Sequence, residues 1–301
     1  MTLPHLPHKV HRIGEVTIQK VVEQPLQNVP KSFVYPTAEQ EDFEGIAARL
    51  ATGDLEDNRD DLVQSVHTWV VRTPRHLVLI DTGSGNHKQR PLNPLFHEQD
   101  IPFLERLRDE AGVNPADVDY VFNTHLHVDH SGWNTMLENG RWVPTFPNAR
   151  YVFPQKEAEY YGSPASHNEV NIPSRGVFED SVLPVIEAGL VDFIGPDGGN
   201  YLDNFKFIPT RGHSVGHMSV QLTSGNETAI FGGDVLHHPI QVLKPHLNTV
   251  FCEFPEDATA SREKILRTLA DSHALYCATH FAGSSAGYVT RGDHGYIWSY
   301  A

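Results

Sequence analysis

Short runs of apolar residues, broken by polar loops, give the first half of the chain a pattern of strands. Runs rich in β-branched and aromatic residues predict strands at residues 16–22, 65–72, 76–81 and 118–122. Thr73-Pro74 separates two of these runs and predicts a hairpin-type break between them.

The second half repeats this rhythm, with helical periodicity between the strands. Apolar runs predict strands at residues 151–153, 205–208, 218–222, 228–231 and 274–278. Apolar spacings of three and four predict helices at residues 43–50, 102–111, 154–161 and 259–272, with another at 181–190 that Pro184 interrupts. No Gly/Ser-rich or Pro-rich linker separates the halves. The pattern predicts one α/β domain, in which two sheets pack face to face and helices lie outside.

Composition narrows the class of protein. The chain has 301 residues, 39% of them hydrophobic and 20% charged, which is typical of a soluble globular protein. A net charge of -15 argues against a nucleic-acid partner, because binding to a phosphate backbone relies on Lys and Arg. The N-terminus has no apolar core of signal-peptide type, and no run is long enough to span a membrane. With only Cys252 and Cys277, each in an apolar stretch, we expect a cytoplasmic protein with two buried thiols.

One short motif concentrates potential metal ligands. His125-Leu126-His127-Val128-Asp129-His130 follows directly after the predicted strand at 118–122. His125 and His127 are two residues apart, so in an extended segment their side chains share one face and can bind one cation. Asp129 and His130 come where the strand gives way to a loop, and can turn toward a second cation. Imidazole and carboxylate are ligands of divalent metals such as zinc.

Four more polar residues each follow an apolar run. They are Asp81, His213, Asp234 and His280. Taken alone, each could be a turn-capping carboxylate or a core histidine. Their shared place at strand ends instead predicts that they gather around one centre.

This series resembles the metallo-β-lactamase superfamily. The motifs are Asp81-Thr82-Gly83, the histidine cluster, Gly212-His213, Gly232-Gly233-Asp234 and Thr279-His280, all in the family's order. The resemblance implies an αββα sandwich and two divalent metal ions, with zinc favoured over manganese, cobalt or iron(II). It also implies one metal on His125, His127 and His213, a second on Asp129, His130 and His280, and Asp234 bridging them. Asp81 would orient a ligand without binding metal. The relatives with a di-iron redox centre have a carboxylate where His127 stands, so such a centre is disfavoured here.

The resemblance also implies an activity. The metal pair would activate a bridging hydroxide that attacks a lactone or related ester, as in the quorum-quenching N-acyl homoserine lactonases. Asp129 would orient the hydroxide and pass a proton to the leaving oxygen. Residues 1–60 exceed the family's minimal core, so we expect a single domain over 1–301 with an N-terminal extension that helps form a homodimer or covers the site.

His237 separates two branches of the family. It stands three residues after Asp234, where the lactonases usually carry a Tyr that assists the substrate carbonyl. The Asp-x-x-His arrangement is more similar to the branch that includes the methyl parathion hydrolases. His237 is therefore either a second catalytic residue that contacts substrate or a surface residue. His217 is expected to be a structural turn partner.

The alternative functions differ from a lactonase either in the substrate or in the class of protein. His237 suggests an organophosphate or aryl ester hydrolase on the same site. A β-lactamase is disfavoured because those enzymes lack a bridging carboxylate such as Asp234. A metal-binding effector with little catalysis is the alternative of another class. Tyr160 and Tyr161 could line a substrate pocket or belong to the core, whereas Trp133 is expected in the core.

Overall fold

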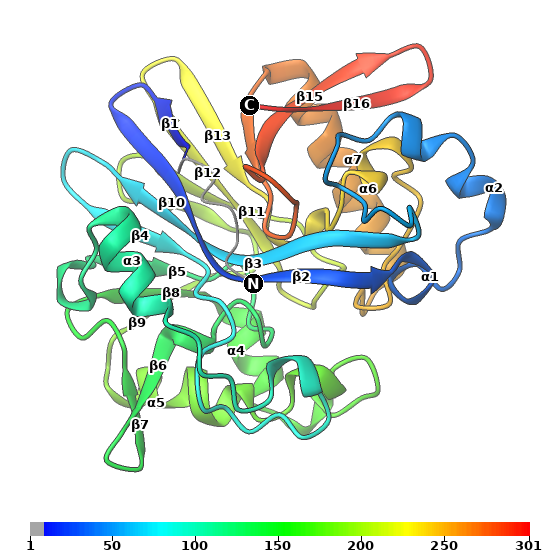
Figure 1. Cartoon of the computed structure of the whole chain (residues 1–301). Helices are drawn as coiled ribbons and strands as arrows, with labels where there is room; N and C mark the ends of the chain where they lie inside the picture. The colour runs from blue at the N-terminus through cyan, green and yellow to red at the C-terminus, as the bar shows by residue number, and fades with distance from the viewer. Residues whose placement is uncertain (1–8) are drawn as a thin grey trace.

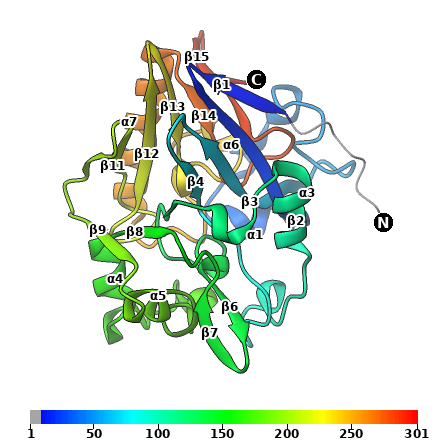
Figure 2. The ribbon, with the colours of Figure 1, turned by 90° about the vertical axis from the view of Figure 1, so that its left-hand side faces the viewer.

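Two seven-stranded sheets lie face to face, with helices on their outer surfaces, in the computed structural model, which describes residues 9–301 (Figure 1). The predicted αββα sandwich is confirmed. Figure 2 shows the layers from the side, with α7 (Pro255–Ser272) and α3 (Phe103–Ala111) on opposite sides of the strands. The N-terminal residues considered for a signal peptide lie partly outside the described residues. No helix of the described part of the chain is long and apolar enough to cross a membrane.

The first sheet has the order β1-β2-β3-β4-β5-β8-β9. β1 to β4 are antiparallel, whereas β4, β5, β8 and β9 run parallel. Its strands are β1 (Val10–Ile13), β2 (Val16–Pro30), β3 (Asp61–Arg72), β4 (Leu77–Ile80), β5 (Tyr120–Phe122), β8 (Arg150–Pro154) and β9 (Val191–Ile194). The predicted strands of the first half therefore all exist, and β2 is longer than predicted.

The second sheet has the order β10-β11-β12-β13-β14-β15-β16 and is antiparallel except between β13 and β14. Its strands are β10 (Gly199–Tyr201), β11 (Phe205–Pro209), β12 (Met218–Ser224), β13 (Glu227–Phe231), β14 (Leu275–Cys277), β15 (Ala286–Gly292) and β16 (Gly295–Tyr300). A separate hairpin is formed by β6 (Thr135–Glu138) and β7 (Arg141–Pro144).

Alternation along each strand divides the apolar residues between two cores. In β4, Val78 and Ile80 face the core between the sheets, whereas Leu77 and Leu79 face the outer core beneath the helices. Phe103 and Leu107 of α3 fill that outer core. α7 covers the second sheet in the same way, through a third core. Each sheet therefore packs against a core on both of its faces, and this fixes the positions of the loops at its edge.

The remaining helices are short. They are α1 (Lys31–Val34), α2 (Gln40–Phe43), α4 (Gln155–Tyr161), α5 (Leu183–Glu187) and α6 (Ile240–Leu243). The helix predicted at 43–50 is wrong, because Gly45 adopts a left-handed φ of 69° and leaves only a 3-10 turn at Ile46–Ala48 beyond it. The helix predicted at 181–190 is a π-helical segment at Phe178–Val182 followed directly by α5, and the change of helix type comes just before Pro184, which lies in the first turn of α5.

Candidate metal centre

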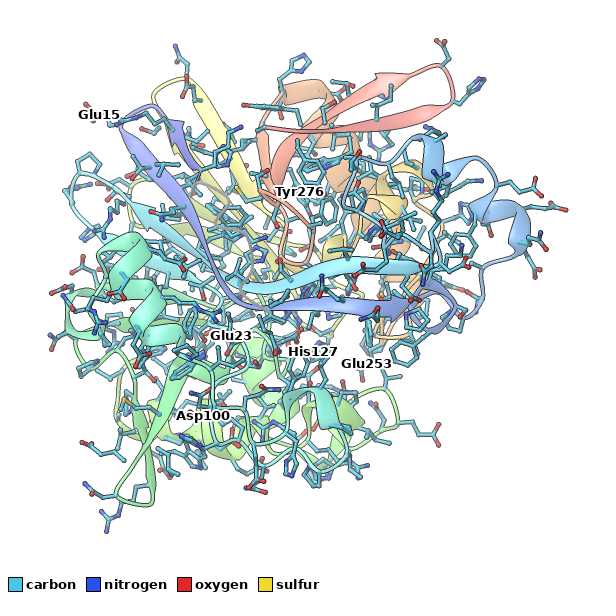
Figure 3. The ribbon with its side chains drawn as sticks, in the orientation of Figure 1. Glu15, Glu23, Asp100, His127, Glu253 and Tyr276 are labelled. Carbon is cyan, nitrogen blue, oxygen red and sulfur yellow. The ribbon has the colours of Figure 1, made fainter. Side chains whose placement is uncertain are left out.

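The predicted ligands converge because they all follow strands that end at one edge of the sandwich. β13 and β14 are parallel and end at the paired residues Phe231 and Cys277. Asp234 and His280 each stand three residues beyond that pair. In the first sheet, β4 and β5 are parallel too, and their following loops carry Asp81 and the histidine cluster. Carboxyl ends of neighbouring parallel strands are a common place for binding sites. In Figure 3, His127 lies near the middle of the molecule, between Glu23 and Glu253.

Three histidines form the first group of candidate ligand atoms. His125 Nε2 lies 3.1 Å from His127 Nδ1 and 3.1 Å from His213 Nε2. His127 Nδ1 and His213 Nε2 are 2.8 Å apart. All three side chains are buried, so these nitrogens face a common point away from bulk water.

A second group lies on the other side of Asp234. His130 Nε2 and His280 Nε2 lie 3.3 Å and 3.2 Å from Asp234 Oδ1. Both nitrogens are also 3.6 Å from an oxygen of Asp129. The other oxygen of Asp234, Oδ2, lies 3.2 Å from His213 Nε2 in the first group. One carboxylate therefore faces both groups, one oxygen toward each.

Asp81 holds the histidine cluster without facing either group. Its carboxylate accepts hydrogen bonds from Thr124 N (2.8 Å), from Thr124 Oγ1 (2.8 Å) and from His130 Nδ1 (3.0 Å). Because Nδ1 of His130 is engaged in this way, its Nε2 is left to face Asp234. Asp81 itself adopts φ of 54°, an uncommon conformation for a residue with a Cβ.

Burial and the central carboxylate set the charge state of the centre. Burial alone would raise the pKa of Asp234, but the surrounding histidines, His130 and His280 foremost, hold it well below its usual value. Burial opposes protonation of His130, yet Asp234, Asp129 and Asp81 raise its pKa well above the ordinary value. Burial lowers the pKa of His127 to about 4, so that imidazole stays neutral at pH 7. Neutral imidazole and ionised carboxylate are the forms that bind metal ions.

Comparison with known proteins identifies the family. The sequence profile described as "Metallo-beta-lactamase superfamily" matches residues 62–280, more than half of the chain. The chain belongs to the metallo-β-lactamase superfamily.

Named relatives in this superfamily match parts of the chain. The N-acyl homoserine lactonase of Bacillus cereus is 24% identical over 169 residues, which cover 52% of this chain and 57% of that enzyme. The N-acyl homoserine lactonase AttM of Azorhizobium caulinodans is 40% identical over 53 residues, covering 18% of this chain and 17% of AttM. The matched part of the chain thus spans well under two thirds of the length of either relative.

Solved structures of the superfamily match nearly the whole chain. The hydrolase AbOPH superimposes with a TM-score of 0.81 at 23% identity, covering 98% of this chain and 97% of AbOPH. AidC, a dizinc quorum-quenching lactonase in complex with a product, superimposes with a TM-score of 0.76 at 21% identity and the same coverage. At such identities the likeness shows the superfamily's fold.

His237 lies inside the centre and not on the surface. It is 2% exposed, and its Nε2 is 3.3 Å from Asp234 Oδ2. Its ring stacks on that of His280, with centroids 5.8 Å apart and planes at 14°. Neither ring nitrogen has a well-directed hydrogen-bond partner among the described residues. Burial lowers the pKa of His237, so the ring is neutral at pH 7.

Gly233 and His217 support the carboxylate of Asp234. Gly233 has φ of 55°, and a Cβ there would lie 2.5 Å from His217 Nε2. His217 Nε2 accepts a hydrogen bond from the backbone N–H of Asp234 at 2.9 Å, while its Nδ1 lies 2.9 Å from Thr210 Oγ1. His217 is therefore a buried structural partner, as the sequence predicted.

Sequence reasoning missed two residues that hold the ligand loops. The buried carboxylate of Glu157 accepts hydrogen bonds from Leu126 N (3.2 Å), Ser214 Oγ (2.8 Å) and Gly216 N. Burial raises its pKa to about 7, although these hydrogen bonds favour ionisation. A glutamate within an amphipathic helix gives no signal of such a role. Ser214 and the glycines on either side of it, Gly212 and Gly216, indicate only that the backbone of the His213 loop approaches a neighbouring segment closely.

The second missed residue is Glu23, on β2. Its carboxylate accepts from Ser84 N (2.7 Å), Gly85 N (3.0 Å) and Trp133 Nε1 (2.6 Å). It thereby fixes the turn that follows Asp81. Trp133 lies in the outer core, as predicted.

Proposed function

We propose that this protein is a binuclear metal-dependent hydrolase that opens lactones or cleaves related esters. One observation carries the proposal: Asp234 presents one oxygen to each of two groups of buried imidazoles. Supporting it, the curated relatives that match parts of the chain are N-acyl homoserine lactonases.

The residues fit two divalent cations. The buried atoms His130 Nε2 and Asp234 Oδ1 have no well-directed hydrogen-bond partner among the described residues. Unpaired buried polar atoms are costly, and coordination would satisfy them. The donor set contains imidazole and carboxylate without thiolate, which suits zinc and also manganese, cobalt or iron(II). His125, His127 and His213 would hold one ion, and Asp129, His130 and His280 the other, with Asp234 between them.

When bound, such ions lower the pKa of a coordinated water to roughly 7 and polarise a carbonyl or phosphoryl oxygen. The chain's own residues would do the rest. Asp129 is the partly exposed member of the set, so its carboxylate can face both solvent and substrate. It would orient the attacking oxygen and then carry a proton to the leaving oxygen, which in a lactone stays tethered to the product. Asp81 would keep His130 aimed inward.

A second substrate class is favoured by His237. Its neutral, buried ring faces Asp234, and neither ring nitrogen has a well-directed hydrogen-bond partner in the part of the chain that the structure describes, so the ring would contact a substrate carbonyl or phosphoryl group. This position makes an aryl ester or organophosphate a substrate to test beside lactones.

The homodimer expected from residues 1–60 stays a prediction that light scattering at micromolar concentration would check.

The test is initial-rate hydrolysis by the metal-loaded protein, followed by proton release. The panel contains N-acyl homoserine lactones, simple lactones, aryl esters and a phosphotriester, with Asp234→Ala alongside. We expect lactone turnover in the wild type and its loss in the variant. Turnover of the phosphotriester or aryl ester alone would move the substrate class to the second candidate. Two bound metals with no turnover of any compound would contradict the proposal and favour a metal-binding effector.

A further inference from the structure

A polar network lies between the two sheets, next to the loop that follows His280. Lys20 of β2 is paired with Trp69 of β3, and Trp69 belongs to the core between the sheets. Paired residues of neighbouring strands point to the same face of a sheet, so Lys20 points toward the second sheet. Its amino group reaches the loop 281–285, which connects β14 to β15.

Lys20 finds one acceptor for each N–H of an ammonium group. Nζ lies 2.9 Å from Ser65 Oγ on β3. In the loop 281–285 it lies 2.6 Å from Ser285 Oγ and 3.1 Å from Gly283 O. The Phe281 carbonyl is farther from Nζ, at 3.5 Å, and accepts from the Ser285 hydroxyl. Lys20 therefore joins the first sheet to the second through three hydrogen bonds.

His67 fixes the direction of the hydrogen bond at Ser65. Burial lowers the pKa of His67 well below its ordinary value, so the ring is neutral. His67 Nε2 lies 3.0 Å from Ala278 O, which can only accept, so Nε2 carries the proton and Nδ1 is an acceptor. Nδ1 accepts from the Ser65 hydroxyl, 3.0 Å away, and the Ser65 oxygen is left to accept from Lys20.

Ser65 connects this network to His280. The Ser65 carbonyl accepts from His280 Nδ1 at 3.1 Å, and the Ser65 N–H donates to His280 O at 3.1 Å. Because Nδ1 is engaged in this way, His280 Nε2 is left to face Asp234, 3.2 Å from Oδ1. On the other side of His280, Ser285 adopts a φ of 54°, which is uncommon for a residue with a Cβ. Lys20 thus holds both segments that flank His280.

We propose that Lys20 is a positioning residue for the ion of the second group, through its hydrogen bonds to Ser65 and to the loop 281–285. The inference rests on the proposed function, because it requires an ion bound by His280. Lys20 is one of the contacts by which the two sheets pack beside this ligand. Since β2 lies within residues 1–60, the N-terminal extension takes part in the metal centre from inside the fold.

The test is cobalt(II) binding by the metal-free protein, followed by the visible spectrum and by competition with a chelator. The titration is done at pH 6.5, because burial lowers the pKa of Lys20 to about 7 and the ammonium prevails below that value. Lys20→Met keeps the length of the side chain but removes all three donors. We expect it to weaken one of the two ions about tenfold and to leave the affinity for the other unchanged. Unchanged affinity for both ions would overturn the inference.

Gln19→Met is the matched control on β2. Gln19 also makes a contact outside its strand, but its Nε2 donates to Glu110 O of α3, on the outer face of the first sheet. We expect this variant to bind both ions as the wild type does. If Lys20→Met does not fold, Ser285→Ala takes its place, because it removes only one of the three acceptors. It should weaken the same ion by a smaller factor, and an unchanged affinity there would count against the inference.

A His280→Ala background identifies the ion on which Lys20 acts. His280→Ala alone should hold one ion, the one bound by the first group. Adding Lys20→Met should leave the affinity for that ion unchanged, because the ion that Lys20 supports is already lost. A further loss of affinity in the double variant, or equal weakening of both ions in Lys20→Met, would show a general structural role and overturn the inference.

The outcomes separate this inference from the proposed function, because cobalt binding requires no turnover. Weakening of one ion by Lys20→Met, in a protein that hydrolyses no lactone or ester, would remove the proposed activity and keep the role of Lys20. Lactone turnover together with equal cobalt affinities in wild type and Lys20→Met would keep the activity and remove the role of Lys20. A wild type that binds fewer than two ions would overturn both.

Discussion

The two halves of the sandwich contribute to the proposed metal centre in different ways. The first half contributes four of the proposed ligands, His125, His127, Asp129 and His130, from one loop after β5. The second half contributes three, His213, Asp234 and His280, from three separate loops. Local backbone geometry can place the first set. Only the packing of β11, β13 and β14 in one sheet brings the second set together.

Side-chain support differs between the halves as well. His127 and His130 are held at their outer nitrogens by the side chains of Tyr161 and Asp81. His280 is held at Nδ1 by the backbone carbonyl of Ser65, 3.1 Å away, and its own carbonyl accepts from Ser65 N. Ligands of the first half can therefore be loosened by a single substitution, whereas His280 depends on how the two sheets pack.

Loss of the Asp234 carboxylate should have the largest effect, because Asp234 faces proposed ligands of both halves. We expect Asp234→Asn to lower kcat/KM at least about 10³-fold and to reduce metal content below one ion per chain. Elemental analysis after gel filtration and the lactone assay would measure both. His280→Ala is the informative comparison, since it removes a ligand of the second group alone. We expect it to retain one ion per chain; equal loss in both variants would show that the halves do not bind metal separately.

This contrast explains what the sequence could predict. The cluster at 125–130 and the ligands at strand ends could be found because polar residues interrupt apolar runs there. All the predicted strands were confirmed for the same reason, and α3, α4 and α7 were confirmed from their helical spacing of apolar residues. The strands that were not predicted are the four edge strands β1, β9, β10 and β16, the hairpin β6–β7, and β15. β7, β10 and β16 have no buried residue, so they are not set apart by burial in the core. Glu157 and Glu23 act through contacts with distant segments, which no local pattern records.

Glu157 joins the two halves, and its removal should have the next largest effect. Its carboxylate accepts from Leu126 N in the first half and from Ser214 Oγ and Gly216 N in the second. Glu157→Ala leaves these buried donors unpaired, so we expect the free energy of unfolding to fall by about 3 kcal/mol. Urea denaturation of the metal-loaded protein would measure it. Glu159→Ala is the control on the same helix, because Glu159 is exposed. Similar losses in both variants would refute a specific role for Glu157.

Tyr161→Phe tests the side-chain support of the first half. The variant removes the hydroxyl that lies 2.6 Å from His127 Nε2. Loss of such an outer partner should weaken metal binding about 10- to 100-fold. Competition with a chelator would measure this, and the visible spectrum of the cobalt(II) form would report a change at the ion bound to His127. Tyr160→Phe is the control, since the Tyr160 hydroxyl donates to Glu253 and not to a histidine. Unchanged affinity in Tyr161→Phe would show that His127 is held by other means.

The smallest effect concerns one buried cation in each half, Lys88 and Arg262. In the second half, Arg262 donates to the carbonyls of Val235 and Pro245 and stays charged at any ordinary pH. In the first half, Lys88 is fully buried between Thr135 and the Asp180 carbonyl, with its Nζ over the Trp142 ring. Burial lowers the pKa of Lys88 to about 7, with Asp180 opposing this shift.

The sign of the resulting pH dependence follows from proton binding. Between pH 7 and about 10.4, the unfolded chain holds more protons on Lys88 than the folded protein does, so stability rises with pH in this window. Lys88→Met should remove that rise. We expect the stability difference between wild type and variant to shift by about 1 kcal/mol in favour of the wild type from pH 7 to pH 8, measured by urea denaturation. Lys264→Met, on the exposed face of α7, should show no such shift. A pH-independent difference for Lys88→Met would mean that Lys88 stays charged, held by Asp180 as firmly as Arg262 is held by its carbonyls.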